Sequence, residues 1–399
     1  MREMGFMEKL LDGVRVEWLR LGEIGELVRG NGLPKTDFTE NGVPAIHYGQ
    51  IYTYYGNETV QTLSFVSSET AKKLKKVNKG DVVITNTSEN LEDVGKALLY
   101  LGEAQAVTGG HATIFKPDPK ILGKYFVYCT QHSFFFDAKR KLAKGTKVID
   151  VSATDMAKIK FPIPCPDNSK KSLEIQAEIV RILDAMTAHT AELTAELTAR
   201  KKQYDYYRDK LLSFEEGEVE WRTLVDVIKT IKTGKLNANA MVDNGNYPFF
   251  TCDSKPFRID TYAFDTEAII VSGNGSQVGH INYYKGKFNA YQRTYILADC
   301  IEEIKIKFLL IYLKAYLRPY IMQHSKKGSV PYITLPMLQS FKVPLPSLEK
   351  QIHIISVLEK FEVLTESLFE GLPREIELRQ KQYAYYRDLL LSFPAAQAA

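Results

Sequence analysis

The sequence predicts an α+β protein in which two globular α/β domains are separated by two long antiparallel coiled-coil helices and related by pseudo-twofold symmetry. Its 399 residues exceed the size of one ordinary domain. One segment occurs twice, and apolar residues upstream of each copy follow a coiled-coil spacing. With 45% apolar and 25% charged residues, the composition is that of a chain that folds throughout.

The clearest internal repeat lies at two helix ends. The segment RKKQYDYYRDKLLSF at residues 200–214 returns as RQKQYAYYRDLLLSF at residues 379–393, with 12 of 15 positions identical. Upstream, FPIPCPDNSKKSLEIQ ends at Gln176 and KVPLPSLEKQ ends at Gln351, and each combines a Pro-x-Pro strand exit with a helix start. The early segment EKLLDGVRVEW also resembles DKLLSFEEGEVEW at residues 209–221. The amino terminus therefore resembles a displaced helix end, which predicts that it packs beside the last helix and closes the two halves into a ring.

Two segments of mixed strand and helix pattern lie between the repeated blocks and resemble each other only faintly. We expect shared scaffolds with divergent faces to recognise different targets. The predicted boundaries, in chain order, are an amino-terminal segment at 1–18, a first globular domain at 19–164, a central helical spacer at 165–218, a second globular domain at 219–346 and a C-terminal helical region at 347–399.

The helical regions carry a stripe of residues at alternating steps of four and three, which keeps one face of a long helix against a partner. The stripe contains Ile179, Leu183, Met186, Thr190, Leu193, Leu197, Arg200, Tyr204, Tyr207 and Leu211 in the first copy, and Ile354, Leu358, Phe361, Thr365, Leu368, Tyr383, Tyr386 and Leu390 in the second. In the second copy, Gly371 and Pro373 of EGLPRE predict a kink or short break. The first copy carries TAELTAEL at residues 190–197. Each further four-residue unit would lengthen the helix by about 6 Å at a rise of about 1.5 Å per residue, so we interpret this block as a ruler.

Both helix ends concentrate tyrosine and arginine, which protein interfaces favour. The alternative is a purely structural role in the coiled-coil core with a solvated charged face. The duplication predicts two equivalent partner subunits. The residues predicted to bind them are Tyr204, Tyr207, Arg208, Tyr383, Tyr386 and Arg387.

Charge, cysteine content and hydropathy further narrow the classes of protein to which the chain can belong. The net charge of +4 and the pI near 8.5 permit nucleic-acid binding without requiring it. Cys129, Cys165, Cys252 and Cys300 show no CxxC pair and no histidine at metal-ligand spacing, so we expect buried free thiols and no metal site. The segment MREMGFMEKLLDG lacks the apolar core of a signal peptide, and KFLLIYLKAYL is too short to span a membrane and is interrupted by Lys314. We therefore expect a cytoplasmic protein in which KFLLIYLKAYL is a buried helix.

The blocks QYxYYRDxLLSF, GEVEW and GLPREIELRQKQY, together with the TAEL unit, resemble the specificity subunits of type I restriction-modification systems over essentially the whole chain. The resemblance implies two target-recognition domains that each read one half of a bipartite DNA site. It implies helices that set the gap and dock two modification subunits, which are adenine methyltransferases, and two ATP-dependent restriction subunits that complete the endonuclease. S-adenosylmethionine, ATP and magnesium are then expected on these partners, with no cofactor, metal or catalytic residue in this chain.

Candidate DNA contacts come from loops that combine basic, hydroxyl and amide side chains, because phosphates and base edges need such groups. Arginine can read guanine, and asparagine or glutamine can read adenine. The candidates in the first domain are Thr85, Asn86, Lys96, His111, Lys144, Gly145, Thr146 and Lys147. Those in the second are Asn274, Ser276, Gln277, Tyr291, Gln292, Arg293, Lys326, Lys327, Gly328 and Ser329. Solvated turns with ordinary turn chemistry are the alternative for each.

Two other functions are weaker fits. A self-sufficient methyltransferase or nuclease is disfavoured because the sequence has no GxxxxGK(S/T) phosphate loop, no Pro-Pro dipeptide of the Asn-Pro-Pro-aromatic kind found in adenine methyltransferases, and no visible acidic metal cluster. His111 follows Gly109 and Gly110 but lacks a second histidine or paired carboxylate at a convincing spacing, so we expect it to face DNA or solvent. An adaptor that joins protein partners through the coiled coil remains the second alternative.

Overall fold

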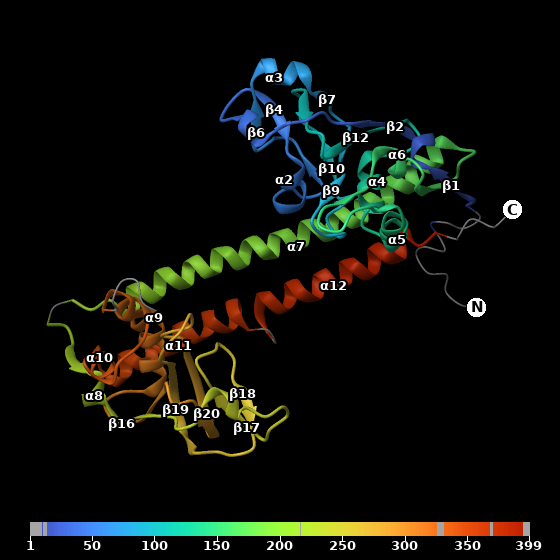
Figure 1. Ribbon diagram of the computed structural model, residues 1–399. Coiled ribbons are helices and arrows are strands. Elements are labelled where there is room, and N and C mark those ends of the chain that lie inside the picture. Colours follow the sequence, from blue (N-terminus) through green and yellow to red (C-terminus); the bar gives the residue numbers. More distant parts are fainter. Residues whose placement is uncertain (1–9, 11–13, 216, 325–330, 368–369, 394–399) are drawn as a thin grey trace. The chain divides into compact units, whose positions relative to one another are not determined.

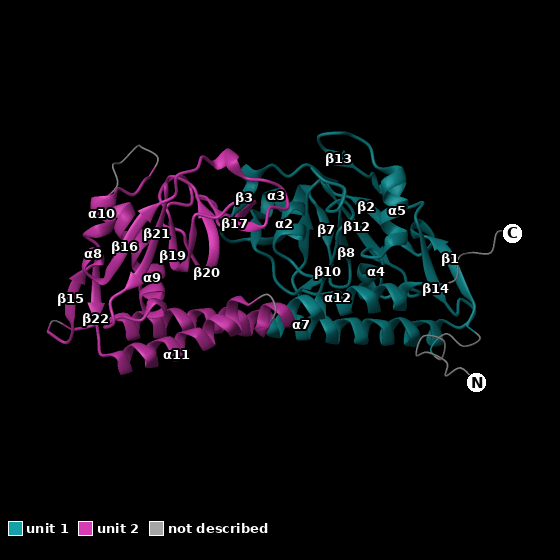
Figure 2. Cartoon of the chain, turned by 90° about the horizontal axis from the view of Figure 1, so that it is seen from below, with its two compact units in different colours: residues 1–193, 376–399 teal, residues 194–375 magenta. Residues whose placement is uncertain are grey.

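The structure, a computed structural model, describes residues 10, 14–215, 217–324, 331–367 and 370–393. The chain forms two compact units, unit 1 with residues 1–193 and 376–399, and unit 2 with residues 194–375 (Figure 2). Helix α7 (Ser169–Leu212) passes from unit 1 into unit 2 between Leu193 and Thr194, inside the tandem TAEL block. Helix α12 (Gly371–Leu391) returns to unit 1 after Glu375. The predicted architecture of two globular α/β parts joined by long helices is confirmed.

Unit 1 is built on two five-stranded sheets. The first has the strand order β2 (Gly25–Arg29), β12 (Ala112–Pro117), β8 (Val82–Thr85), β10 (Ala97–Tyr100) and β5 (Glu58–Thr59). The second has the order β3 (Phe38–Thr39), β6 (Ser64–Val66), β4 (Val43–Ile46), β11 (Ala106–Thr108) and β7 (Lys75–Val77). A short pair is formed by β9 (Thr87–Ser88) and β13 (Ile149–Asp150). The short helices are α2 (Tyr48–Thr53), α3 (Ser68–Lys73), α4 (Gly123–Cys129), α5 (Ser133–Leu142) and α6 (Ala153–Met156).

The largest core of unit 1 joins the first sheet, α4, α5 and both long helices. Phe115 of β12 and Phe126 of α4 are fully buried with ring centroids 4.6 Å apart. Ile179 near the start of α7 and Leu390 near the end of α12 belong to the same core, so these two helix segments run antiparallel (Figure 1). Trp18 packs against this core from the amino-terminal side. The predicted amino-terminal segment 1–18 lies outside the described residues at 1–9 and 11–13.

Unit 2 contains one six-stranded sheet in the order β16 (Ile228–Thr233), β21 (Thr294–Cys300), β19 (Phe264–Ser272), β20 (Ile281–Ala290), β17 (Tyr247–Phe250) and β18 (Phe257–Ile259). Its helices are α8 (Leu224–Val227), α9 (Ile306–His324), α10 (Leu335–Gln339) and α11 (Leu348–Glu366). KFLLIYLKAYL lies within α9, and Phe308 and Leu313 of this segment are fully buried in the core. The prediction of a buried helix is confirmed.

Each unit contains the same two-stranded sheet. In unit 1, β1 (Val16–Arg20) pairs antiparallel with β14 (Lys160–Pro164), and Trp18 faces Pro162. In unit 2, β15 (Glu220–Thr223) pairs antiparallel with β22 (Lys342–Leu345), and Trp221 faces Pro344. The Glu-Trp and Pro-x-Pro blocks that the sequence repeats therefore form equivalent strands.

The second helical region is broken where the sequence predicts a break. Helix α11 ends at Glu366, and α12 begins at Gly371, which has a φ of +77°. A Cβ atom at Gly371 would lie 2.5 Å from the carbonyl oxygen of Val363, so this turn requires glycine. The first region, in contrast, is one helix of 44 residues.

The four cysteines differ in how deeply they are buried. All four cysteines are free, but only Cys129 is fully buried, whereas Cys165, Cys252 and Cys300 are half-buried. The expectation of four buried thiols was therefore wrong for three, because they lie at strand ends and in loops. Within the described part of the chain, no helix combines the length and the apolar character needed to cross a membrane.

Candidate nucleic-acid interface

A buried glutamine ties the globular part of unit 1 to its long helix. Gln176 of α7 is fully buried, and its Oε1 accepts a hydrogen bond from the backbone N–H of Leu122 at 2.9 Å. Its Nε2 donates to the carbonyl oxygen of Lys120 at 2.9 Å. Lys124 of α4 adds an ion pair with Asp184 of α7 at 3.3 Å. The helix thus holds the backbone that leads into α4.

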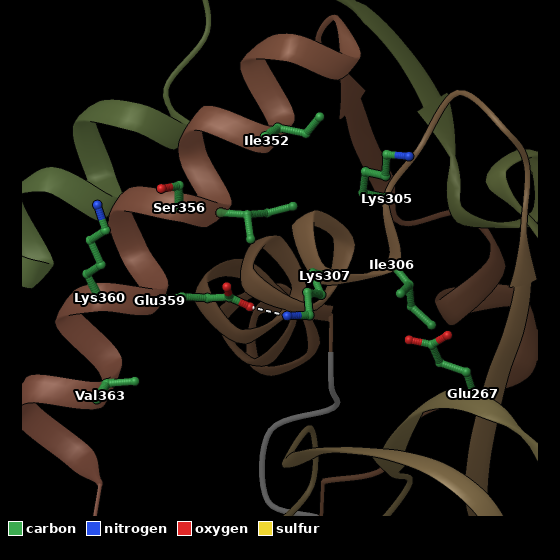
Figure 3. A pocket seen from close by; sticks show the side chains of 10 residues that line it. Glu267, Lys305, Ile306, Lys307, Ile352, Ser356, Glu359, Lys360 and Val363 are labelled. Atoms are coloured by element: carbon green, nitrogen blue, oxygen red, sulfur yellow. Dashed lines mark hydrogen bonds and ion pairs between the residues drawn. The ribbon is translucent and has the colours of Figure 1, made fainter. Parts of the chain in front are cut away.

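Unit 2 repeats this junction. Gln351 of α11 is fully buried, its Oε1 accepts from the backbone N–H of Lys305 at 2.8 Å, and its Nε2 donates to the carbonyl oxygen of Glu303 at 2.8 Å. Lys307 at the start of α9 pairs with Glu359 of α11 at 2.7 Å (Figure 3). The glutamines that end the repeated sequence blocks therefore fix each globular part to its helix by the same contacts.

A hollow of about 720 Å³ lies beside this ion pair, between α11, the start of α9 and β19 (Figure 3). Ile352 and Val363 of α11 line it and are 55% and 48% exposed. Glu267 and Lys360 supply charges at its edges. The hollow marks an apolar surface along the junction in unit 2.

Asn86 joins three loops of unit 1. Its backbone N–H donates to the carbonyl oxygen of His111 at 2.8 Å, and its carbonyl oxygen accepts from the N–H of Val151 at 3.0 Å. Its side-chain Nδ2 donates to the carbonyl oxygen of Val151 at 2.8 Å, and its Oδ1 accepts from the hydroxyl of Thr113 at 2.8 Å. The loop after β8, the turn before β12 and the segment after β13 therefore meet at one residue.

The structure corrects the prediction that Thr85 and Asn86 contact DNA directly. Both side chains are fully buried. The hydroxyl of Thr85 donates to the carbonyl oxygen of Asp93 at 2.6 Å. These two residues position the surrounding loops instead. Lys96 is partly exposed and pairs with Asp93 at 2.8 Å, and it stays a candidate.

The side chain of His111 is exposed to solvent and contacts two neighbouring residues. Its Nδ1 is hydrogen-bonded to the hydroxyl of Thr87 at 2.8 Å, and its ring packs on Tyr48 with centroids 4.8 Å apart. Strand β13 pairs Asp150 with Thr87, and Lys144 exchanges both backbone hydrogen bonds with Asp150. The structure therefore brings His111 and the predicted basic loop to one surface.

The basic loop itself is a turn with exposed side chains. Gly145 has a φ of +96°, and Thr146 and Lys147 are exposed. Hydrogen bonds from Lys158 and Lys144 hold the pKa of Asp155 well below its usual range. The ion pair of Lys144 with Asp155, at 3.1 Å, anchors one end of the loop.

Unit 2 uses the same backbone pattern with different side chains. Gly273 occupies the position of Asn86, because its N–H donates to the carbonyl oxygen of Arg293 at 2.9 Å and its carbonyl oxygen accepts from the N–H of Ile333 at 2.7 Å. Arg293 therefore occupies the position of His111.

The adjoining strand contact is also repeated. Asn274 pairs with Tyr332, as Thr87 pairs with Asp150 in unit 1. The candidates of this region are exposed at Ser276, Gln277, Gln292 and Arg293, and half-buried at Asn274 and Tyr291. The candidates Lys326, Lys327, Gly328 and Ser329 lie outside the described residues.

The repeated tyrosines divide into inward and outward positions. Burial raises the pKa of both Tyr204 and Tyr383 to about 12. The hydroxyl of Tyr383 donates to Oε1 of Gln131 at 2.7 Å. Tyr206 and Tyr385, which the sequence analysis did not single out, are 61% and 65% exposed. They form the outward-facing pair of the repeated block.

The other residues predicted to bind partners also have contacts within the chain. Tyr207 stacks on Phe361 with ring centroids 5.8 Å apart. Arg208 and Arg387 are each ion-paired with an aspartate of their own helix, and Tyr386 is 39% exposed. Their role toward partners stays a prediction.

Sequence reasoning missed Asp150 and Tyr332. Each follows one of the two basic loops, in KVIDV and VPYIT. Aligning these segments on Val151 and Ile333 could have found them. Across the described ranges, no three or more His, Cys, Asp or Glu side chains are grouped so as to hold a metal ion.

Comparisons with known proteins agree with this organisation. The family model of the type I restriction modification DNA specificity domain matches residues 14–200 and 216–378. The chain is 36% identical to the specificity subunit of the type I restriction enzyme EcoR124I/EcoR124II of Escherichia coli over 417 aligned positions, which cover 99% of this chain and 98% of that subunit. It is 33% identical to the EcoprrI specificity subunit of Escherichia coli over 390 positions, covering 93% of each.

Solved structures share the fold. The type I restriction-modification S subunit from M. genitalium aligns with a TM-score of 0.58 and 17% identity over 97% of this chain and 98% of that chain. A chain from a structural study of the assembly and conformational transition of the type I R-M system aligns with a TM-score of 0.60 and 17% identity, covering 94% and 96%. Because the family model matches both halves of the sequence, the chain belongs to the family of type I restriction-modification DNA-specificity subunits.

Proposed function

We propose that this chain reads a bipartite DNA site, with one half-site recognised by the globular part of each unit. The chain itself performs no catalysis in this proposal. It positions DNA so that an adenine can be flipped into the pocket of a modification subunit, since the base cannot be methylated within the stack. S-adenosylmethionine, ATP and magnesium belong to the modification and restriction subunits.

The repeated loop pattern carries this proposal. The two units share the backbone hydrogen bonds of Asn86 and Gly273, yet they present His111 in one case and Arg293 in the other. Base edges are distinguished by the donors and acceptors that face them. One scaffold with different surface groups is therefore suited to reading two different half-sites.

The helices support a complex with two modification subunits. Tyr206 and Tyr385 occupy equivalent positions of the repeated block and are both exposed. Tyrosine is frequent among residues that dominate protein interfaces. Two copies of one surface fit two copies of one partner, and the family membership supports a multi-subunit assembly with DNA.

Duplex binding tests the proposal. The chain, co-purified with its modification subunit, is titrated with a duplex that contains the split motif and with duplexes altered in either half. We expect each alteration to weaken binding. The ratio of the affinities for the unaltered and the altered duplex should be similar at different salt concentrations. An assembled complex that binds all duplexes equally would favour the adaptor function.

We also propose that the TAEL block sets the gap. Inserting one TAEL unit after Leu197 lengthens α7 by about 6 Å, which corresponds to one or two base pairs at about 3.4 Å each. The preferred gap should lengthen by that amount, as measured by methylation of duplexes with varied spacers. The exposed Ala195→Gln substitution, which keeps the length, serves as a control. An unchanged preferred gap after the insertion would contradict the hypothesis that the TAEL block sets the gap.

A further inference from the structure

We infer that His111 and Arg293 are equivalent base-reading residues, one in each target-recognition domain. The inference rests on the proposed DNA-reading function and names side chains that determine the two half-sites.

The backbone places both residues in the same turn. The N–H of Ala112 donates to the carbonyl oxygen of Gly109 at 3.1 Å, so His111 is the third residue of a tight turn that enters β12. The N–H of Thr294 donates to the carbonyl oxygen of Tyr291 at 2.9 Å in the turn that enters β21. Arg293 is therefore the third residue of the equivalent turn.

The backbone of each turn is fixed by a hydrogen bond from a buried residue. The carbonyl oxygen of His111 accepts from Asn86, and that of Arg293 accepts from Gly273. A Cβ atom at Gly273 would lie 2.2 Å from the carbonyl oxygen of Arg293, so any larger residue at position 273 would displace the backbone of Arg293. Base reading needs side chains that start from a fixed backbone position, and both turns meet that need.

Both side chains keep polar groups directed to solvent. The contact of His111 Nδ1 with Thr87 leaves Nε2 for an external hydrogen bond. Arg293 is exposed, and no carboxylate of the described residues forms an ion pair with its guanidinium. A guanidinium can donate two parallel hydrogen bonds to O6 and N7 of guanine, whereas an imidazole nitrogen forms one bond to a base edge.

The inference therefore predicts a guanine contacted by Arg293 in one half-site and a position read by His111 in the other. The alternative is that either residue contacts a phosphate. A phosphate contact weakens binding about equally for all sequences, whereas a lost base contact relaxes one position.

The test compares Arg293→Ala, Arg293→Lys and His111→Ala in the complex with the modification subunit. Methylated sites are mapped after co-expression, and affinities are measured for the cognate duplex and for duplexes with single base changes. Lys342→Ala removes an exposed positive charge from β22 in the same unit and is the matched control. Co-purification with the modification subunit shows that each variant is folded.

We expect Arg293→Ala to lose a discrimination of about 5- to 150-fold at one guanine, which is the contribution of a good bidentate contact. Arg293→Lys should keep most of the affinity and still lose this discrimination, because lysine has no planar fork. His111→Ala should relax one position in the other half-site. Lys342→Ala should leave the motif unchanged.

An unchanged motif in the Arg293 and His111 variants, or a uniform loss of affinity for all sequences, would overturn the inference while leaving the proposed function standing. Relaxation of the same half-site by both variants would also overturn it. A wild-type complex without any split-site preference would instead refute the proposed function.

Discussion

Replacing Gln351 by methionine should loosen the junction between the globular part of unit 2 and α11. Gln351 makes three hydrogen bonds to the backbone, at 2.8 Å each, with Lys305, Glu303 and Pro346. Methionine has a similar volume, so it keeps the packing and removes only the polar contacts.

The expected cost follows from these three bonds. A hydrogen bond contributes roughly 0.5–1.5 kcal/mol net, and the cost is higher when a buried partner is left without a replacement. The free energy of unfolding of unit 2 should therefore fall by about 3 kcal/mol. For a unit of this size that is a shift of about 1 M in the urea midpoint.

Urea unfolding of the wild-type and variant chains measures this shift, and amide hydrogen exchange at Lys305 reports the junction directly. Lys360→Met changes an exposed residue of the same helix and should alter stability by less than about 0.5 kcal/mol. If Gln351→Met unfolds at the same urea concentration as Lys360→Met, and Lys305 remains protected, the junction does not depend on this glutamine.

Three further predictions concern other buried contacts. Asn86→Ala removes two side-chain hydrogen bonds and should destabilise unit 1 by about 2 kcal/mol in urea unfolding, and an unshifted midpoint would contradict its role in joining the loops. Gly273→Ala forces a Cβ atom to within 2.2 Å of the carbonyl oxygen of Arg293 and should weaken duplex binding, while Gly56→Ala, with no atom within 4 Å, should not. Burial lowers the pKa of Lys139 from 10.5 to about 8, so between these pH values the unfolded chain binds more protons than the folded chain. The contribution of Lys139 to the free energy of unfolding should therefore rise with pH over that window, and a difference between wild type and Lys139→Met that stays flat would refute it.

The helical scaffold could be predicted because its constraints are periodic in the sequence. Within the TAEL block, Thr190, Leu193 and Leu197 are half-buried, while the residues between them are exposed, as the stripe requires. The same stripe placed Tyr204 inward. The pattern is therefore less consistent with a partner-binding role for Tyr204 than with such a role for the neighbouring Tyr206, which faces solvent.

The loop cluster could not be predicted in the same way. Asn86 stands in a polar run that is typical of an exposed loop, but its burial arises from Thr113 and Val151, which lie far away in the sequence. The equivalence of His111 and Arg293 is hidden because their turns, Gly-Gly-His and Tyr-Gln-Arg, share no residue. Backbone hydrogen bonds constrain these turns, and such bonds leave no direct sequence signal.

A map of methylated adenines, made after co-expression of the chain with the proposed modification subunit, tests directly whether the two units read two half-sites. Two half-sites read by two units predict a split motif with an adenine methylated in each half and a fixed gap of unread bases. Methylation at one undivided motif would contradict the two-reader account.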